Sequence, residues 1–79
     1  MNLIKQYKLK VKVDLYNHDE HEYDRHLIVY VVSSDDEMSG REKELLAEMV
    51  SSAESRKGDI TFSGWIREEE VIEEIYTFI

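Results

Sequence analysis

The chain of 79 residues contains no cysteine, no proline and only three glycines. Without cysteine it can form no disulfide, thiolate metal site or cysteine nucleophile, and the redox compartment stays undetermined. The glycines stand at positions 40, 58 and 64, so neither a G-x-G-x-x-G fingerprint nor a glycine-rich phosphate loop can form. With no motif that carries a reaction, we expect a protein that is not an enzyme and needs no cofactor.

Long apolar runs are also missing from the sequence. No segment approaches the ~20 consecutive apolar residues of a membrane-spanning helix. Residues 1–8 lack the order and the apolar length of a secretion signal, so we expect a cytoplasmic protein without membrane contact. The composition, 42% hydrophobic and 35% charged, is typical of a folded chain, and this length allows one hydrophobic core. We therefore expect a single domain over residues 1–79.

The formal net charge of -8 is unevenly distributed along the chain. Residues 1–34 hold five acidic and five basic side chains, whereas residues 35–79 hold thirteen acidic and five basic ones. All of the net charge therefore belongs to the second half, which makes a basic partner more plausible than nucleic acid.

A β-hairpin is predicted for the first half. Residues 7–15 alternate strictly between apolar and polar side chains, the period of a half-buried strand. Residues 23–32 are rich in β-branched and aromatic side chains and predict a second strand. A turn centred on Asp19 would pair Tyr7 with Val31 and would place apolar residues opposite one another on the inner face.

The outer face of this hairpin would carry a lysine row beside an apolar row. The residues concerned are Lys8, Lys10, Lys12, Ile28, Tyr30 and Val32. Lysine stems and a chain terminus could cover the apolar row, or a partner subunit could do so. Lysines beside tyrosines are also found on surfaces that bind single-stranded nucleic acid, but the net charge opposes such binding. We expect no direct contact with nucleic acid.

The sequence Ser39-Gly-Arg-Glu42 matches the S-x-x-E capping box at the start of a helix. One apolar stripe follows at helical spacing, formed by Leu45, Leu46, Met49, Val50 and Ala53. Gly58 fits the C-terminal cap, with Arg56 and Lys57 in the last turn. We therefore expect a helix between Ser39 and Gly58.

Residues 59–66 predict a third strand, and residues 67–79 predict a second helix. In the last segment Val71, Ile72, Ile75, Tyr76 and Ile79 repeat the apolar spacing of the first helix. A terminal strand from Glu74 is the alternative. The expected fold is thus α+β, with hairpin, helix, strand and helix in order and both helices on one face of a three-stranded sheet. The expected core comprises Leu9, Val11, Val13, Leu27, Val29, Val31, Leu45, Leu46, Met49, Val50, Ile60, Phe62, Val71, Ile72 and Ile75.

The histidines and their acidic neighbours form the densest group of potential metal ligands. His18 and His21 fall in the predicted turn and His26 points outward from a strand, so they match no specific ligand spacing. We expect no metal site. A small-molecule or metal-binding protein that uses this loop and the tyrosines is the least favoured class.

The acidic residues of the two predicted helices are the best functional lead. We expect the protein-binding residues to be Glu44, Glu48, Glu69, Glu70, Glu73 and Glu74. On a helix, the last four would form like-charged i,i+4 pairs, which folding alone does not favour. Such rows could imitate phosphates and occupy the basic groove of a nucleic-acid-handling protein, although high charge also serves solubility. We expect an acidic inhibitor or regulator that acts by occupancy; the alternative is an assembly module that dimerises through Ile28, Tyr30 and Val32.

Overall fold

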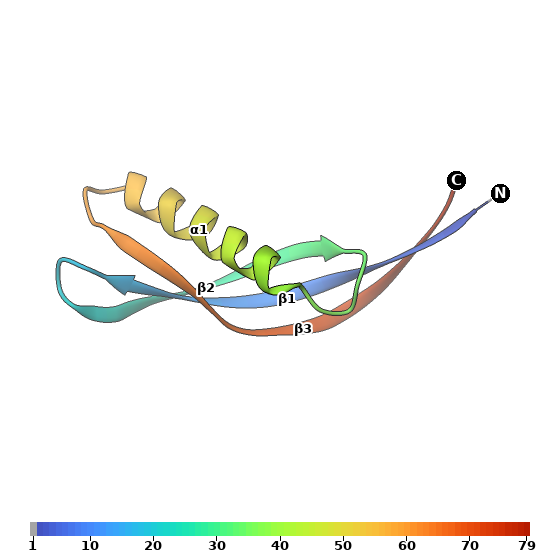
Figure 1. Cartoon of the computed structure of the whole chain (residues 1–79), viewed down its shortest axis with the longest axis horizontal. Coiled ribbons are helices and arrows are strands. Elements are labelled where there is room, and N and C mark those ends of the chain that lie inside the picture. The colour runs from blue at the N-terminus through green and yellow to red at the C-terminus, as the bar shows by residue number, and fades with distance from the viewer. Residues whose placement is uncertain (1) are drawn as a thin grey trace.

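The computed structural model describes residues 2–79 and shows a small α+β domain with one helix and a three-stranded antiparallel sheet. The elements are β1 (Leu3–Asn17), β2 (Glu22–Ser33), α1 (Gly40–Arg56) and β3 (Phe62–Phe78). The strand order is β2-β1-β3, so the first strand is central. Figure 1 shows α1 lying across one face of the sheet while the other face stays uncovered. The single helix of the described chain does not meet the length and apolarity that a membrane crossing requires.

The predicted hairpin is confirmed, with a register that differs by two residues. Leu9 lies opposite Val31 and not opposite Val29. Because a shift of two preserves the alternation, the side chains paired between Tyr7 and Leu15 keep their predicted faces. Beyond Leu15 the register shifts again, so Tyr23 lies opposite Tyr16 and is exposed. The turn follows Asn17, a buried residue whose Oδ1 accepts the backbone N–H groups of Asp19 and Glu20 at 2.9 and 3.1 Å.

The second helix, predicted over residues 67–79, is wrong. These residues continue the third strand, so β3 begins at Phe62 and runs to Phe78 along the whole of β1. The alternative of strand structure from Glu74 describes the end of the chain correctly as far as Phe78. β1 runs alongside this segment and supplies hydrogen-bond partners for its backbone as a strand. A short helix would bond within itself but would be only marginally stable without an apolar surface to pack against.

Two β-bulges explain why the sequence resembles a helix here. The register between β1 and β3 shifts twice, and the extra residues are Arg67 and Ile72. Each bulge moves the alternation of side chains by one residue. Val71, Ile72 and Ile75 therefore fall at a spacing that is typical of helices although they belong to a strand.

The charges of β1 and β3 also favour the strand. On the outer face three lysines of β1 stand opposite three glutamates of β3: Lys8 with Glu73, Lys10 with Glu70 and Lys12 with Glu68. The last pair has an N–O distance of 3.1 Å. Opposite charges across neighbouring strands contribute roughly 0.2–1 kcal/mol each, whereas the same glutamates on a helix would repel one another.

α1 begins at the predicted capping box, which is confirmed. The Ser39 hydroxyl accepts from the Glu42 backbone N–H at 3.2 Å, and the Glu42 carboxylate accepts from the Ser39 N–H at 2.9 Å. The predicted cap at Gly58 is wrong. The C-cap is Lys57, and the left-handed backbone conformation (φ 41°) falls on Asp59.

The core is smaller than predicted for two reasons: α1 turns a different face toward the sheet, and the predicted second helix is part of β3. The buried apolar residues are Leu9, Val11, Val13, Leu15, Met38, Ala47 and Phe62. Partly buried residues packed against them include the predicted Leu27, Val29, Val31, Leu46, Val50 and Ile60. Predicted core residues that are instead exposed are Leu45, Met49, Val71 and Ile72, while Ile75 is half-buried. Small side chains on α1, Ala47 and Ser51, face β3 and let the helix approach closely.

The sheet extends beyond the helix as a two-stranded ribbon, which we call the arm (Leu3–Gln6 with Ile75–Phe78). β2 ends at Ser33, opposite Tyr7, so the arm consists of β1 and β3 alone. The molecule is consequently elongated, with extents of 53 × 20 × 18 Å. Asn2 and Ile79, the two ends of the described chain, bond to one another at the tip of the arm (Figure 1).

Acid should destabilise the fold through the two ends of α1. The Ser39 backbone N–H and hydroxyl lower the pKa of Glu42, and Lys57 with Arg25 lowers the pKa of Glu54. Carboxyl groups with lowered pKa stabilise the folded state above their ordinary pKa, and this contribution is lost as the pH falls through the lowered value. Urea unfolding should therefore show stability decreasing below about pH 4.5.

Glu42→Gln provides the control for this pH dependence. A glutamine keeps an acceptor for the Ser39 N–H but does not titrate. The variant should lose less stability than the wild type between neutral and acidic pH. An equal loss in both proteins would contradict the assignment to the capping box.

Candidate protein-binding surfaces

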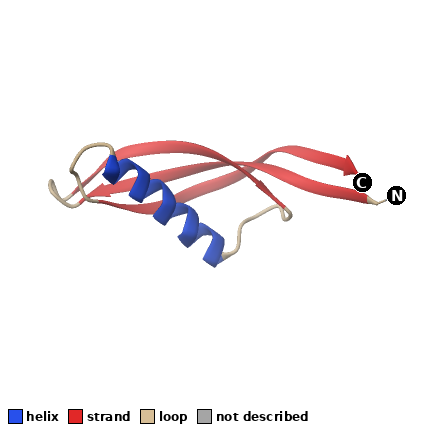
Figure 2. Cartoon of the chain, turned by 90° about the horizontal axis from the view of Figure 1, so that it is seen from above, coloured by secondary structure: helices blue, strands red, loops and turns tan. Residues whose placement is uncertain are grey.

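A groove separates one flank of α1 from the outer edge of β3. Its volume is about 740 Å³, and on the strand side it is lined by the uninterrupted run Phe62–Ile66. On the helix side it is lined by one stripe: Gly40, Lys43, Glu44, Ala47, Glu48, Ser51 and Ser52. Figure 2, seen from above, shows α1 crossing the sheet obliquely rather than following one strand. Because consecutive strand residues line the groove, the strand backbone itself forms part of its wall.

The depth of the groove depends on Gly64. A Cβ atom at this position would lie 2.5 Å from the Ala47 carbonyl oxygen, closer than van der Waals contact permits. Glycine is therefore required here by the close approach of helix and strand, and not by an unusual backbone angle. The small side chains of Ala47 and Ser51 on the facing side serve the same approach.

Hydrogen bonds next to the groove define the orientation of the β3 backbone. The Thr61 carbonyl accepts from the His18 N–H of the hairpin at 2.9 Å. The Phe62 N–H points to the opposite side, where it donates to the Ser55 hydroxyl at 3.0 Å. Backbone groups of successive residues therefore alternate between the β1 side and the outer edge, as in any antiparallel ladder.

The same alternation gives the direction of the backbone N–H and C=O groups in the next four residues. Ser63 and Trp65 direct their backbone groups toward β1, whereas Gly64 and Ile66 direct theirs toward the outer edge. Within residues 2–79, no strand pairs with this edge of β3. The groove thus contains backbone donors and acceptors without a protein partner in the described chain.

The rim of the groove is acidic. Glu44 and Glu48 lie one helical turn apart, and neither forms an ion pair within residues 2–79. Lys43, the only basic residue that lines the groove, is bound to Glu69 at 3.2 Å. Trp65 adds an indole ring that is 66% exposed. The groove therefore presents negative charge beside a strand edge, and the Trp65 ring lies on the other face of that strand, because Gly64 next to it faces α1.

The six glutamates predicted to bind a partner do not share one surface. Glu44 and Glu48 are at the groove. Glu69 points under α1, where it also accepts the Met38 N–H at 3.1 Å. The other three are on β3 beyond the groove: Glu70 and Glu73 on the outer face opposite lysines, and Glu74 at the base of the arm.

Glu74 is engaged within the chain. Its carboxylate accepts from the Tyr76 hydroxyl at 2.9 Å and pairs with the Lys5 ammonium at 3.3 Å. Both partners lower the pKa of Glu74, the Tyr76 hydroxyl most. This glutamate is therefore less available to an external cation than Glu44 or Glu48.

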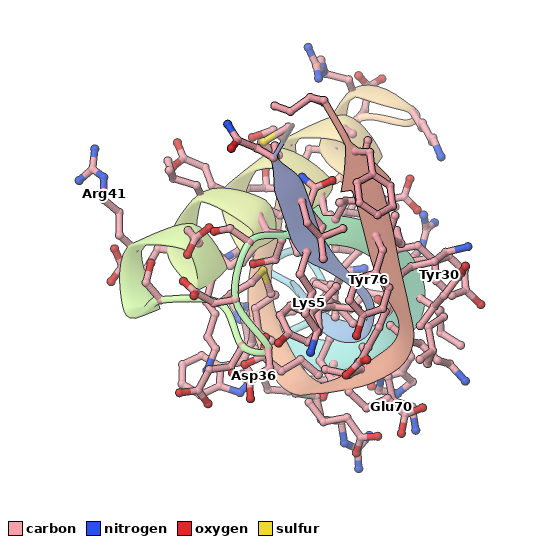
Figure 3. The ribbon with its side chains drawn as sticks, turned by 90° about the vertical axis from the view of Figure 1, so that its right-hand side faces the viewer. Lys5, Tyr30, Asp36, Arg41, Glu70 and Tyr76 are labelled. Carbon is pink, nitrogen blue, oxygen red and sulfur yellow. The ribbon has the colours of Figure 1, made fainter. Side chains whose placement is uncertain are left out.

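The predicted outer apolar row is present on the uncovered face of the sheet. Ile28, Tyr30 and Val32 are 53%, 56% and 58% exposed. The Lys8 ammonium lies 5.4 Å from the centre of the Tyr30 ring, so a lysine covers part of the row as one interpretation expected. Asn2 and Ile79, the described ends of the chain, bond to one another beyond the Leu3–Phe78 pair of the arm and so lie away from this row. Figure 3 shows Tyr30 and Glu70 on the side of the molecule away from Arg41 of α1.

The histidines are held apart from one another. His26, on β2, contacts Asp14 of β1 at 2.7 Å, whereas His18, in the turn after β1, contacts Ser63 of β3 at 2.6 Å. An exposed carboxylate cluster, Glu20 with Glu22 and Asp24, follows the turn, and the proximity of Glu22 raises the pKa of Glu20. The imidazoles do not converge with this cluster.

Sequence reasoning found the acidic side of the groove but missed its strand side. Gly64 and Trp65 were assigned only to a short strand. A glycine within a strand, combined with small residues at a helical spacing of four, was the available signal for a close contact between helix and strand. Comparison with protein families, with curated proteins and with solved structures found no match to the chain, so its function is inferred from these surfaces.

Proposed function

We propose that this protein is a non-enzymatic binding protein that acts by occupying a basic, extended segment of another protein. The observation that carries the proposal is the groove, in which two uncompensated glutamates face an open strand edge. In such a site main-chain hydrogen bonds supply affinity, and alternate side chains supply specificity.

The ligand segment would add to β3 as a fourth strand. Its backbone would bond to Gly64 and Ile66, the residues whose N–H and C=O groups face outward. Because α1 lies near the edge of the present sheet, a strand added at β3 would place the helix over the middle of the sheet (Figure 2). The added strand would thus cover apolar surface that three strands leave exposed.

Side chains of the bound segment would alternate between two environments. One set would face α1, where Glu44 and Glu48 favour lysine or arginine. The other set would point to the opposite side, near the exposed Trp65 ring, which favours apolar or cationic groups. The preferred ligand is therefore an extended peptide with basic residues at every second position.

Glu69, Glu70, Glu73 and Glu74 do not form the helical, phosphate-like row that their spacing predicts. It required a helix over residues 67–79, and β3 occupies that segment. Glu70 and Glu73 face Lys10 and Lys8, which neutralise them in part. The protein would still act by occupying a basic partner, and the residues that bind this partner would be Glu44 and Glu48.

Peptide display on the immobilised protein should select alternating basic sequences, and their affinity should fall with salt. Glu44→Gln with Glu48→Gln should weaken binding about tenfold, because two ion pairs of roughly 0.7 kcal/mol each are lost. Trp65, the only tryptophan, reports binding through its fluorescence. Glu70→Gln with Glu73→Gln is the matched control, since it changes the net charge equally on the other face.

Methylation of the peptide backbone tests the strand geometry. N-methyl groups at alternate positions should abolish binding where the N–H faces β3 and should be tolerated at the positions between. Binding without this two-residue period would contradict strand addition. Equal losses in the two glutamine variants would contradict the groove as the site.

Self-association through the outer face is the second candidate function. It is favoured by the exposed row of Ile28, Tyr30 and Val32. Sedimentation should then show a dimer for the wild type and a folded monomer for Tyr30→Lys. A dimer that survives Tyr30→Lys would contradict this interface.

A further inference from the structure

The arm has an open β1 edge, because β2 stops short of it. From Asn17 back to Tyr7, β1 lies between β2 and β3. Tyr7 pairs with Ser33, the last residue of β2, so residues before Tyr7 have no β2 neighbour. The backbones of Asn2 and Ile79 exchange both hydrogen bonds at 2.9 Å. In an antiparallel ladder the even-numbered residues of β1, Ile4 and Gln6, therefore bond to β3, while Leu3 and Lys5 direct their N–H and C=O groups to the open side.

We propose that two copies of the chain pair through these open edges, with β1 of one arm antiparallel to β1 of the other. A two-fold axis through Ile4 places Leu3 opposite Lys5 of the second copy, and Ile4 opposite its own equivalent. Leu3 and Lys5 then exchange four backbone hydrogen bonds across the axis. A four-stranded sheet results, and the proposal does not depend on the groove or on its ligand.

The side chains of the arm are self-complementary in this register. On the side of the outer face the two Ile4 residues meet, each flanked by Thr77 of its own β3. On the other side Leu3 and Phe78 of one copy meet the Lys5 stem and the Tyr76 ring of the second. Phe78 and Tyr76 are 68% and 54% exposed, and in the dimer they flank the Leu3–Lys5 contact from the two outer strands, which extends the apolar row across all four strands. Figure 3, seen from the side of the arm, shows Lys5 beside Tyr76.

Charge favours the β1 edge over the β3 edge of the arm. Lys5 is the only charged residue within Leu3–Gln6 and Ile75–Phe78, and Glu74 neutralises it at 3.3 Å. Pairing through β3 would bring two glutamate-rich strands together, whereas pairing through β1 keeps them on the outside. The arms also hold the two acidic bodies at opposite ends of a long particle, where salt screens their repulsion.

Single-cysteine variants test the register, because the protein has no cysteine of its own. The two Ile4 residues form a pair without hydrogen bonds, with Cα atoms ~4.5 Å apart, a distance that suits a disulfide. Ile4→Cys should therefore oxidise rapidly to a covalent dimer. Gln6→Cys should not, because its equivalents would lie ~14 Å apart. Sedimentation of the wild type at high micromolar concentration should show the same dimer without a cross-link.

Three results would overturn the proposal. The first is a wild type that stays monomeric at high micromolar concentration. The second is cross-linking of Gln6→Cys as fast as Ile4→Cys, which would indicate random collision of flexible arms. The third is preferential cross-linking of Tyr30→Cys, which would assign the dimer to the outer face. Circular dichroism of each reduced variant checks that it is folded.

Discussion

Val11→Asp should leave the chain unfolded, whereas Ile72→Asp should fold with little loss of stability. Val11 is fully buried in the central strand, between Val29 of β2 and Glu69 of β3. An aspartate there would lose its hydration and stand beside another carboxylate, at a cost of several kcal/mol. A core of this size supplies only about 3–5 kcal/mol of net stability, so the folded state would not be populated.

Ile72→Asp is the matched control, with the same charge introduced at an apolar residue. Ile72 is an extra residue at a β-bulge and is 45% exposed. Its replacement should cost at most about 1 kcal/mol, mainly through lower strand propensity. Urea unfolding followed by circular dichroism measures both variants. An unfolded Ile72→Asp would contradict the strand and restore the helix that the apolar spacing predicts.

The hairpin and the helix could be predicted because their signals are local. Residues 7–15 alternate without interruption, and the inner positions of that run are the buried ones in the structure. Ser39 and Glu42 form the capping box that their spacing indicates. In both cases the residues that carry the signal are also the residues that form the contact.

The last segment could not be predicted from its own residues, because its partner strand decides its structure. Arg67 and Ile72 interrupt the period of two, and nothing in the segment marks them as bulges. The cue lay in β1, where lysines at positions 8, 10 and 12 are spaced to meet glutamates across a strand. Reading the two charge rows together would have favoured a long antiparallel pair.

Only the helix side of the groove could be predicted from the sequence, because the strand side depends on contacts between distant segments. Glu44 and Glu48 could be identified by their charge, because local signals such as the capping box place them on a helix. The strand side depends on which edge of the sheet stays open and on how closely α1 approaches it, and both follow from the position of β3 as an edge strand.

Gly64→Val should destabilise the fold and move α1 away from β3. The first added carbon alone would lie 2.5 Å from the Ala47 carbonyl oxygen, which belongs to the helix backbone and cannot rotate away. Overpacking of this kind costs about 1–3 kcal/mol, a large share of the stability of a small domain. The displaced helix should also widen the groove, so that Glu44 and Glu48 no longer face the backbone of Ile66.

Gly58→Ala is the control for this substitution. No atom lies within 4 Å of a Cβ atom built at Gly58, and its φ angle is not positive, so alanine should be neutral or slightly stabilising there. Urea unfolding measures the two stabilities, and amide chemical shifts of Ala47 and Ser51 report the displacement of α1. If Gly64→Val is as stable as the wild type and leaves these shifts unchanged, then helix and strand are not in close contact. In that case the open edge of β3 would lack the acidic wall on which the proposed binding of a basic segment depends.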